Sequence, residues 1–124
     1  MTAQDGHPCR SLLELVVDDF LSANNISHKL EPVYPWHHTL NPTGTRRGDW
    51  LLPGRVVVEA AGMNSEAYLN KLAQKRALAE LAGFRLVTVL PAQLDDLASL
   101  FQAHLPQGPL AGAEVEEAFP SAIG

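Results

Sequence analysis

The chain has 124 residues, of which 9 are lysine or arginine and 14 are aspartate or glutamate, giving a formal net charge of −5. Its length matches the about 100–150 residues of a typical domain, and a hydrophobic share of 46% is enough for a core, so we expect one folded domain. The single cysteine excludes an intrachain disulfide and a cysteine-based zinc site. No apolar run approaches the ~20 residues that span a bilayer, and no signal-peptide pattern opens the chain, so we expect a soluble cytoplasmic protein without a membrane partner.

The first expected element is a helix that begins after Ser11, a residue typical of helix N-caps. Apolar residues recur there at spacings of three and four, namely Leu13, Val16, Val17, Phe20 and Leu21. Residues 28–34 then alternate weakly, as a strand would. Pro32 lacks an amide donor, so this strand is expected at a sheet edge.

A long loop and a hairpin are expected next. Residues 35–48 are rich in Pro, Gly, Asn and Thr, which favour turns, and the length of this loop suggests a function. Two apolar runs, residues 49–52 and 56–60, flank Pro53-Gly54, a pair that favours a tight turn. We therefore predict a β-hairpin.

The second half of the chain predicts a helix, a strand and a last helix. The helix runs from a cap at Asn64 or Ser65 to about Ala82, with one basic face and a buried stripe of Leu69, Leu72, Ala73, Ala77 and Leu81. Residues 84–90 form a β-branched run that predicts a buried strand, parallel to residues 56–60 because a helix joins the two. The last helix would carry Leu94, Leu97, Leu100 and Phe101.

These elements predict an α/β fold with a mixed sheet flanked by helices. Residues 106–124 mix Pro, Gly, Ala and acidic residues without a clear period, which is typical of a flexible C-terminal tail. We therefore expect a single domain over residues 1–105.

Two acidic residues at the base of the hairpin are candidates for chemistry. With a two-residue turn, Asp49 and Glu59 fall on opposite faces, whereas one extra loop residue sets them directly opposite each other. Opposed carboxylates, with Cβ atoms ~4.5–5.5 Å apart, repel each other unless a cation lies between them, and Mg²⁺ suits such a pair. The alternative is two solvated acids at strand ends.

Glu14, Lys71 and Lys75 also have two interpretations each. Ser11-x-x-Glu14 matches a capping box, and the same carboxylate could also lie beside a metal. Lys71 and Lys75 are four residues apart and share a helix face, with Tyr68 one turn earlier. An ammonium group there could stabilise charge on a phosphate, or it could belong to an exposed basic face.

The negative total charge hides a basic segment. Residues 46–85 carry seven basic and four acidic side chains, a net charge of +3, which could attract a polyanion or form a solvated helix face. His37 and His38 are expected to contact phosphate or solvent. His7 and His28 lie far from them in the sequence, which is not a zinc-binding spacing.

Together these residues form an arrangement similar to that of a known family. It consists of Glu14 on the first helix, Gly48-Asp49-Trp50, the run VVVEAAGM at residues 56–63, and Tyr68-x-x-Lys71-x-x-x-Lys75. The chain resembles the PD-(D/E)xK nucleases, which have a restriction-endonuclease-like αβββαβ core. Within them it is similar to the small domains related to very-short-patch-repair and homing endonucleases, over about Ser11 to Leu97.

The resemblance implies a Mg²⁺-dependent DNA endonuclease, for which Mn²⁺ can substitute. Asp49 and Glu59 would bind the metal, Glu14 would complete the site, and Lys71 or Lys75 would stabilise the transition state. The residues implied to contact DNA are Arg46, Arg47, His37, His38 and Tyr68.

Two positions depart from the family pattern: Gly48 stands where the family often has a proline, and Ala61 stands where the motif has its lysine. Either a lysine of the following helix supplies that charge, or the domain is an inactive module that binds DNA or a protein partner. A structural domain that binds no nucleic acid is a third alternative. A homodimer is also left open, because one active site cuts both strands only as a dimer or by sequential nicks.

Overall fold

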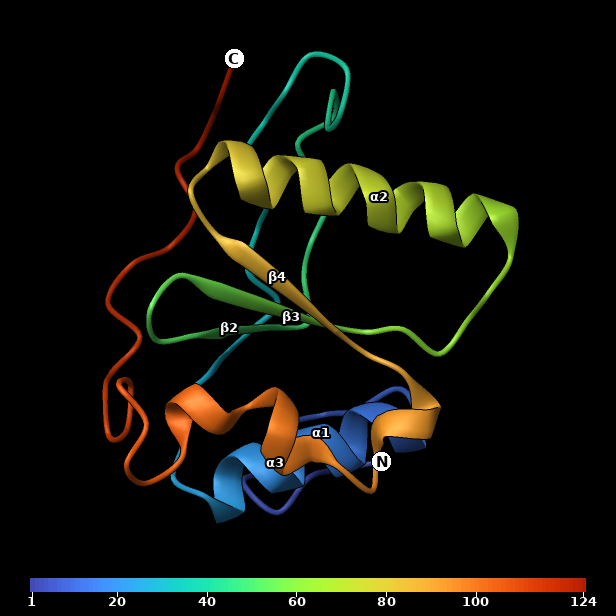
Figure 1. Ribbon diagram of the computed structural model, residues 1–124. Helices are drawn as coiled ribbons and strands as arrows, with labels where there is room; N and C mark the ends of the chain where they lie inside the picture. Colours follow the sequence, from blue (N-terminus) through green and yellow to red (C-terminus); the bar gives the residue numbers. More distant parts are fainter.

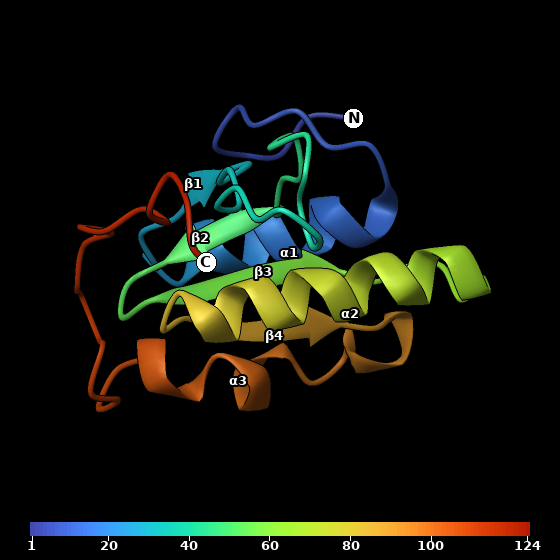
Figure 2. The ribbon, with the colours of Figure 1, turned by 90° about the horizontal axis from the view of Figure 1, so that it is seen from above.

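The computed structural model describes residues 1–124 and has three layers, with a sheet between helices (Figure 1). Helix α2 covers one face of the sheet, and α1 and α3 cover the other, as both views show (Figures 1 and 2). None of the helices combines the length and the apolar character needed to cross a membrane. The elements are α1 (Leu12–Ala23), β1 (Lys29–Leu30), β2 (Trp50–Leu52), β3 (Val56–Ala60), α2 (Glu66–Leu81), β4 (Arg85–Val89) and α3 (Leu97–Leu100).

The sheet has four strands in the order β1-β2-β3-β4. β1 pairs antiparallel with β2, β2 pairs antiparallel with β3, and β3 pairs parallel with β4, with α2 as the crossover. The predicted α/β class, mixed sheet and parallel pair are therefore confirmed. The predicted edge position of β1 is also confirmed, but β1 holds only two residues instead of the expected seven.

The hairpin has a three-residue loop. Leu52 pairs with Val56, which leaves Pro53, Gly54 and Arg55 unpaired. Gly54 and Arg55 have φ values of 80° and 61°, so the extra residue is accommodated in the left-handed region. The predicted alternative with one extra loop residue is the one that the structure adopts.

The alternation of the strands produces two apolar cores. One core lies against α1 and α3 and contains the strand residues that point to that face: Trp50, Leu52, Val56 and Val58. Leu51 and Val57 point to the opposite face, toward α2. Trp50 is 2% exposed and lies in the first of these cores. Ser11 caps α1 by accepting a hydrogen bond from the Glu14 amide at 3.1 Å, also as predicted.

Two helix predictions were wrong in part. The fully buried residues of α2 are Leu78 and Ala79, whereas Leu69 and Leu81 of the predicted stripe are 49% and 60% exposed. The N-terminal turns of α2 extend past the strands, so this part of the helix has no sheet to cover (Figure 1). The predicted last helix is divided into a 3₁₀ turn at Pro91–Gln93, the short α3, and a second 3₁₀ turn at Gln102–His104.

The C-terminal residues that we expected to form a flexible tail contain no helix or strand, but some of them pack on the domain. Val115 and Phe119 are buried in the core beneath α2. The Phe119 ring stacks on Tyr34 at 4.8 Å and lies 4.4 Å from the ring of Phe84. The second core therefore includes residues beyond the expected domain limit.

Candidate active site

The hairpin register places Asp49 opposite Glu59. Trp50 pairs with Val58, so the next pair outward along the ladder is Asp49 with Glu59. Asp49 lies two residues from Leu51 along the chain, and Glu59 lies two residues from Val57, so each points to the same face as that neighbour. The two carboxylates therefore start from the same face of the sheet, the one that α2 covers.

Glu59 is a buried carboxylate with two partners. It is 3% exposed, its Oε1 accepts a hydrogen bond from Lys75 Nζ at 2.9 Å, and its Oε2 accepts one from the Tyr34 hydroxyl at 2.8 Å. Burial raises the pKa of Glu59 to about 7, and the nearby Asp49 carboxylate acts in the same direction, while the Lys75 ammonium opposes the shift. A carboxyl group with a pKa near neutrality in a partly closed site is typical of functional positions.

Asp49 is held by the backbone of the opposite strand. Its Oδ2 accepts a hydrogen bond from the Ala60 amide at 2.7 Å, and its Oδ1 makes no hydrogen bond. Burial raises the pKa of Asp49, and the Glu14 carboxylate adds to that effect. Asp49 thus has one oxygen held by the backbone and one oxygen without a hydrogen-bond partner.

Glu14 reaches the same place from α1. It lines a pocket of about 140 Å³ together with Asp49, Trp50 and Arg10. Its Oε2 accepts a hydrogen bond from the Arg10 amide at 3.0 Å, one residue before the cap, so the predicted capping box is present in a shifted form. Glu14 therefore contributes to the start of the helix and also lies beside Asp49.

The structure separates the two candidate lysines. Lys75 is half-buried and contacts Glu59, whereas Lys71, one turn earlier, is exposed. The Tyr68 hydroxyl donates to the carbonyl of Ala60 at 3.2 Å, which brings it next to Glu59. Of the basic residues on α2, Lys75 is the one that joins the carboxylates.

The loop residues expected to contact DNA divide into two groups. Arg46 is half-buried, and its guanidinium donates to the carbonyl of Leu40 and to the side chain of Gln74 on α2, so it holds the loop to the helix. His37 is also used internally, because its Nδ1 accepts from the amides of the two residues that follow His38. Arg47 and His38 are exposed.

Tyr34 is a site residue that the sequence analysis missed. It is 1% exposed, and burial raises the pKa of its hydroxyl, so the phenol remains protonated and donates to Glu59. The only available signal was its place in the weakly alternating segment before the loop. That pattern does not indicate which residue a tyrosine contacts.

The site therefore combines oxygen donors with one ammonium group. Asp49 directly precedes β2, Glu59 belongs to β3, Glu14 to α1, and Lys75 to α2. Oxygen donors of this kind suit a hard divalent cation, and an ammonium group suits an anionic substrate. Comparison of the chain with protein-family models, with curated proteins and with solved structures gave no match.

Proposed function

We propose that the chain is a metal-dependent endodeoxyribonuclease of the PD-(D/E)xK type, with a restriction-endonuclease-like core. The observation that carries the proposal is the pairing of Asp49 with Glu59 on one face of the hairpin, with Lys75 2.9 Å from Glu59. The order of elements, αβββαβ, agrees with that core.

The donor set fits Mg²⁺ or Mn²⁺. Asp49 and Glu59 would hold the ion, and Glu14 lines the same pocket as Asp49 with a further carboxylate. Asp49 Oδ1 has no protein partner, so an oxygen is available for a cation without breaking a hydrogen bond. A bound Mg²⁺ would supply Lewis-acid polarisation of a phosphate and a lowered pKa for a coordinated water.

Lys75 takes the place of the motif lysine. Ala61, at the position of that lysine, is 3% exposed, so a charged side chain would not be accommodated there without cost. Lys75 brings its ammonium to Glu59 from the helix that crosses over the same face. An ammonium so placed stabilises negative charge that develops on a scissile phosphate.

DNA would be positioned by the exposed basic side chains near this site. Arg47 lies at the end of the loop and Lys71 on the outer part of α2, and both are exposed. Contacts of this kind go to phosphates and do not read sequence, so binding should weaken steeply with salt.

The test is nicking of supercoiled plasmid in Mg²⁺ or Mn²⁺ by the full chain. We expect the wild type to convert plasmid to the nicked form and Asp49→Asn, purified in parallel, to remain at background. Lys75→Ala should lose about 10²-fold in rate, by analogy with the removal of one transition-state donor, whereas Lys71→Ala should weaken DNA binding and leave the cleavage rate of bound DNA unchanged. The appearance of linear product together with nicked product, and not after it, would indicate a dimer.

Three results would refute the proposed nuclease activity. Cleavage by Asp49→Asn at the wild-type rate would show that the activity comes from elsewhere. A wild type that binds DNA in a salt-dependent manner without cutting it would instead indicate an inactive DNA-binding module, as Ala61 permits. Absence of DNA binding at low salt would indicate a structural domain that binds no nucleic acid.

A further inference from the structure

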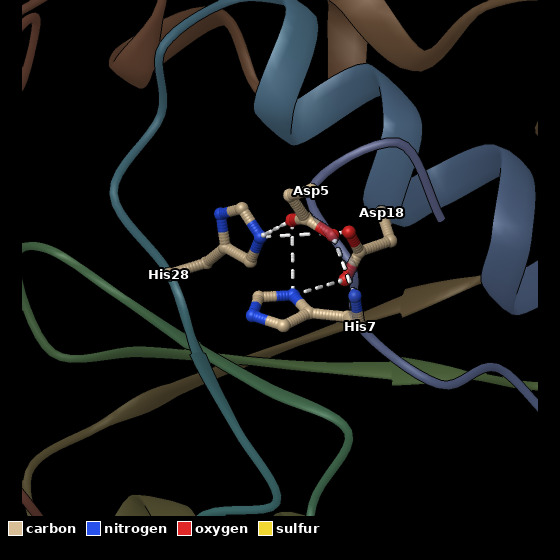
Figure 3. Close-up of side chains that lie close together, drawn as sticks. All are labelled: Asp5, His7, Asp18 and His28. Carbon is tan, nitrogen blue, oxygen red and sulfur yellow. Dashed lines mark hydrogen bonds and ion pairs between the residues drawn. The ribbon is translucent and has the colours of Figure 1, made fainter. Parts of the chain in front are cut away.

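Four side chains of metal-ligating types converge near the N-terminus, next to the pocket that Glu14 and Asp49 line, which Asp18 also borders. Asp5 and His7 come from the N-terminal segment, Asp18 from α1, and His28 from the residue before β1 (Figure 3). One ligand atom from each lies within 4.8 Å of all the others. His7 and His28 do not show a zinc-binding spacing in the sequence, but the fold brings them together.

Three of the four distances between these atoms are hydrogen-bond distances, slightly shorter than the spacing of ligands around a tetrahedral zinc ion. His7 Nδ1 lies 2.9 Å from Asp5 Oδ2 and 3.0 Å from Asp18 Oδ2. His28 Nε2 lies 3.0 Å from Asp5 Oδ2 and 3.7 Å from Asp18 Oδ1. Ligands about 2.0–2.2 Å from a tetrahedral zinc ion lie roughly 3.3–3.6 Å from one another.

The tautomer of His28 is fixed by the backbone. His28 Nδ1 lies 2.7 Å from the carbonyl oxygen of Ile26, which can only accept, so Nδ1 carries the proton. Nε2 is then the ring nitrogen that faces the two carboxylates, and it is the atom that would coordinate a cation. A ring nitrogen that donates to a backbone carbonyl, while the other nitrogen faces acidic groups, is the arrangement found for metal-ligating histidines.

Asp18 supplies a second, independent indication of a ligand. Its side chain is fully buried, and Oδ2 accepts a hydrogen bond from Trp50 Nε1 at 2.9 Å. Its Oδ1 is buried and has no hydrogen-bond partner, although it points toward His28. A buried carboxylate oxygen without a partner is costly, and a cation between Asp18 and His28 would satisfy it.

We propose that Asp5, His7, Asp18 and His28 bind a structural Zn²⁺ ion. Two imidazole nitrogens and two carboxylate oxygens suit zinc, and two carboxylates balance its charge. Four protein ligands leave no open position, which makes the site structural. Asp5 and His7 are partly exposed at its outer side, so the ion can enter from solvent.

The ion would fix the N-terminal segment to α1 and to the edge of the sheet. Residues Pro8, Cys9 and Arg10, which follow the ligand His7, line the pocket that contains Asp49. Zinc would thus hold one wall of that pocket in place. The inference stands without the nuclease proposal, because none of the four ligands belongs to the proposed catalytic set.

The test measures Zn²⁺ binding by the full chain after removal of metals with a chelator and dialysis. Titration with Zn²⁺ alone, monitored by calorimetry, should show one site per chain, and Co²⁺ in its place should give the visible absorption of tetrahedral coordination. At a hundredfold excess of Zn²⁺ over Kd, the Tm should rise by roughly 10 °C.

Matched variants localise the site. Asp5→Asn and His7→Gln alter partly exposed ligands and keep side-chain volume, so the chain should remain folded by circular dichroism and lose at least tenfold in Zn²⁺ affinity. His38→Gln, an exposed histidine outside the cluster, should bind as the wild type does. A wild type that binds no Zn²⁺, or affinity that depends on His38 and not on Asp5 or His7, would overturn the proposal.

Discussion

Replacing Glu59 with glutamine should remove a large part of the pH dependence of stability. Glu59 is 3% exposed and pairs with Lys75 and Tyr34, and burial raises its pKa from its ordinary value of 4.5 to about 7. Because the pKa in the folded state lies above that in the unfolded state, the folded protein binds this proton more tightly. The contribution of the proton to stability is present below pH 4.5 and is lost as the pH rises through 7.

The size of the effect follows from the pKa difference. Each pKa unit corresponds to 1.36 kcal/mol, so the shift from 4.5 to about 7 amounts to about 3 kcal/mol. Glutamine has nearly the same shape, can accept from Lys75, and does not ionise. The free energy of unfolding of Glu59→Gln should therefore increase relative to wild type by about 3 kcal/mol between pH 4 and pH 8.

The measurement is urea unfolding of both proteins at pH values from 4 to 8.5, with EDTA present so that no divalent ion binds. Titration of groups that do not interact with Glu59 contributes equally to both proteins and cancels in the difference. Glu116→Gln, at an exposed position, serves as the control and should follow the wild type. If the curves for wild type and Glu59→Gln stay parallel across this range, the carboxyl group titrates normally and the electrostatic description of the site is wrong.

Three further substitutions test the structure around the site, each by urea unfolding at a fixed pH. Phe119→Ala removes a ring that stacks on Tyr34 and should cost about 3 kcal/mol; a change under about 0.5 kcal/mol would show that the C-terminal segment does not pack there. Asn41→Ala removes a fully buried amide that makes three hydrogen bonds to the backbone, and should cost about 2–3 kcal/mol; an unchanged midpoint would contradict those bonds. Gly54→Ala should cost about 1–2 kcal/mol, because Gly54 has φ of 80° and a Cβ there would lie 2.5 Å from the Leu110 side chain; a stabilised protein would refute that turn.

Local features of the fold could be predicted because neighbouring residues encode them. The cap at Ser11, the spacing of apolar residues in α1 and a chain reversal at Pro53-Gly54 each depend on a few neighbouring residues, and the structure agrees with all three, while the length of the reversal stayed open. The parallel pairing of β3 with β4 follows from a general rule of chain connection.

The buried face of α2 could not be predicted in the same way. Apolar residues occur on several sides of this helix, and only the position of the sheet selects Leu78 and Ala79 over Leu69 and Leu81. The same choice distinguishes Lys75, which meets Glu59, from Lys71, which remains exposed. The spacing of a lysine along a helix does not show whether its side chain meets the sheet or the solvent. That depends on which face of the helix packs on the sheet.

By itself, the sequence determined the α/β class, the order of the elements and the position of two acids at the base of the hairpin. Periodicity and turn residues act through local backbone geometry, so these features can be predicted from short segments. Tertiary structure alone decided the three-residue loop that sets Asp49 opposite Glu59, and the meeting of His7, Asp18 and His28 across a helix and two irregular segments. Convergence of this kind depends on where the chain reverses and on how α1 packs against the sheet. Sequence separation carries no information about either.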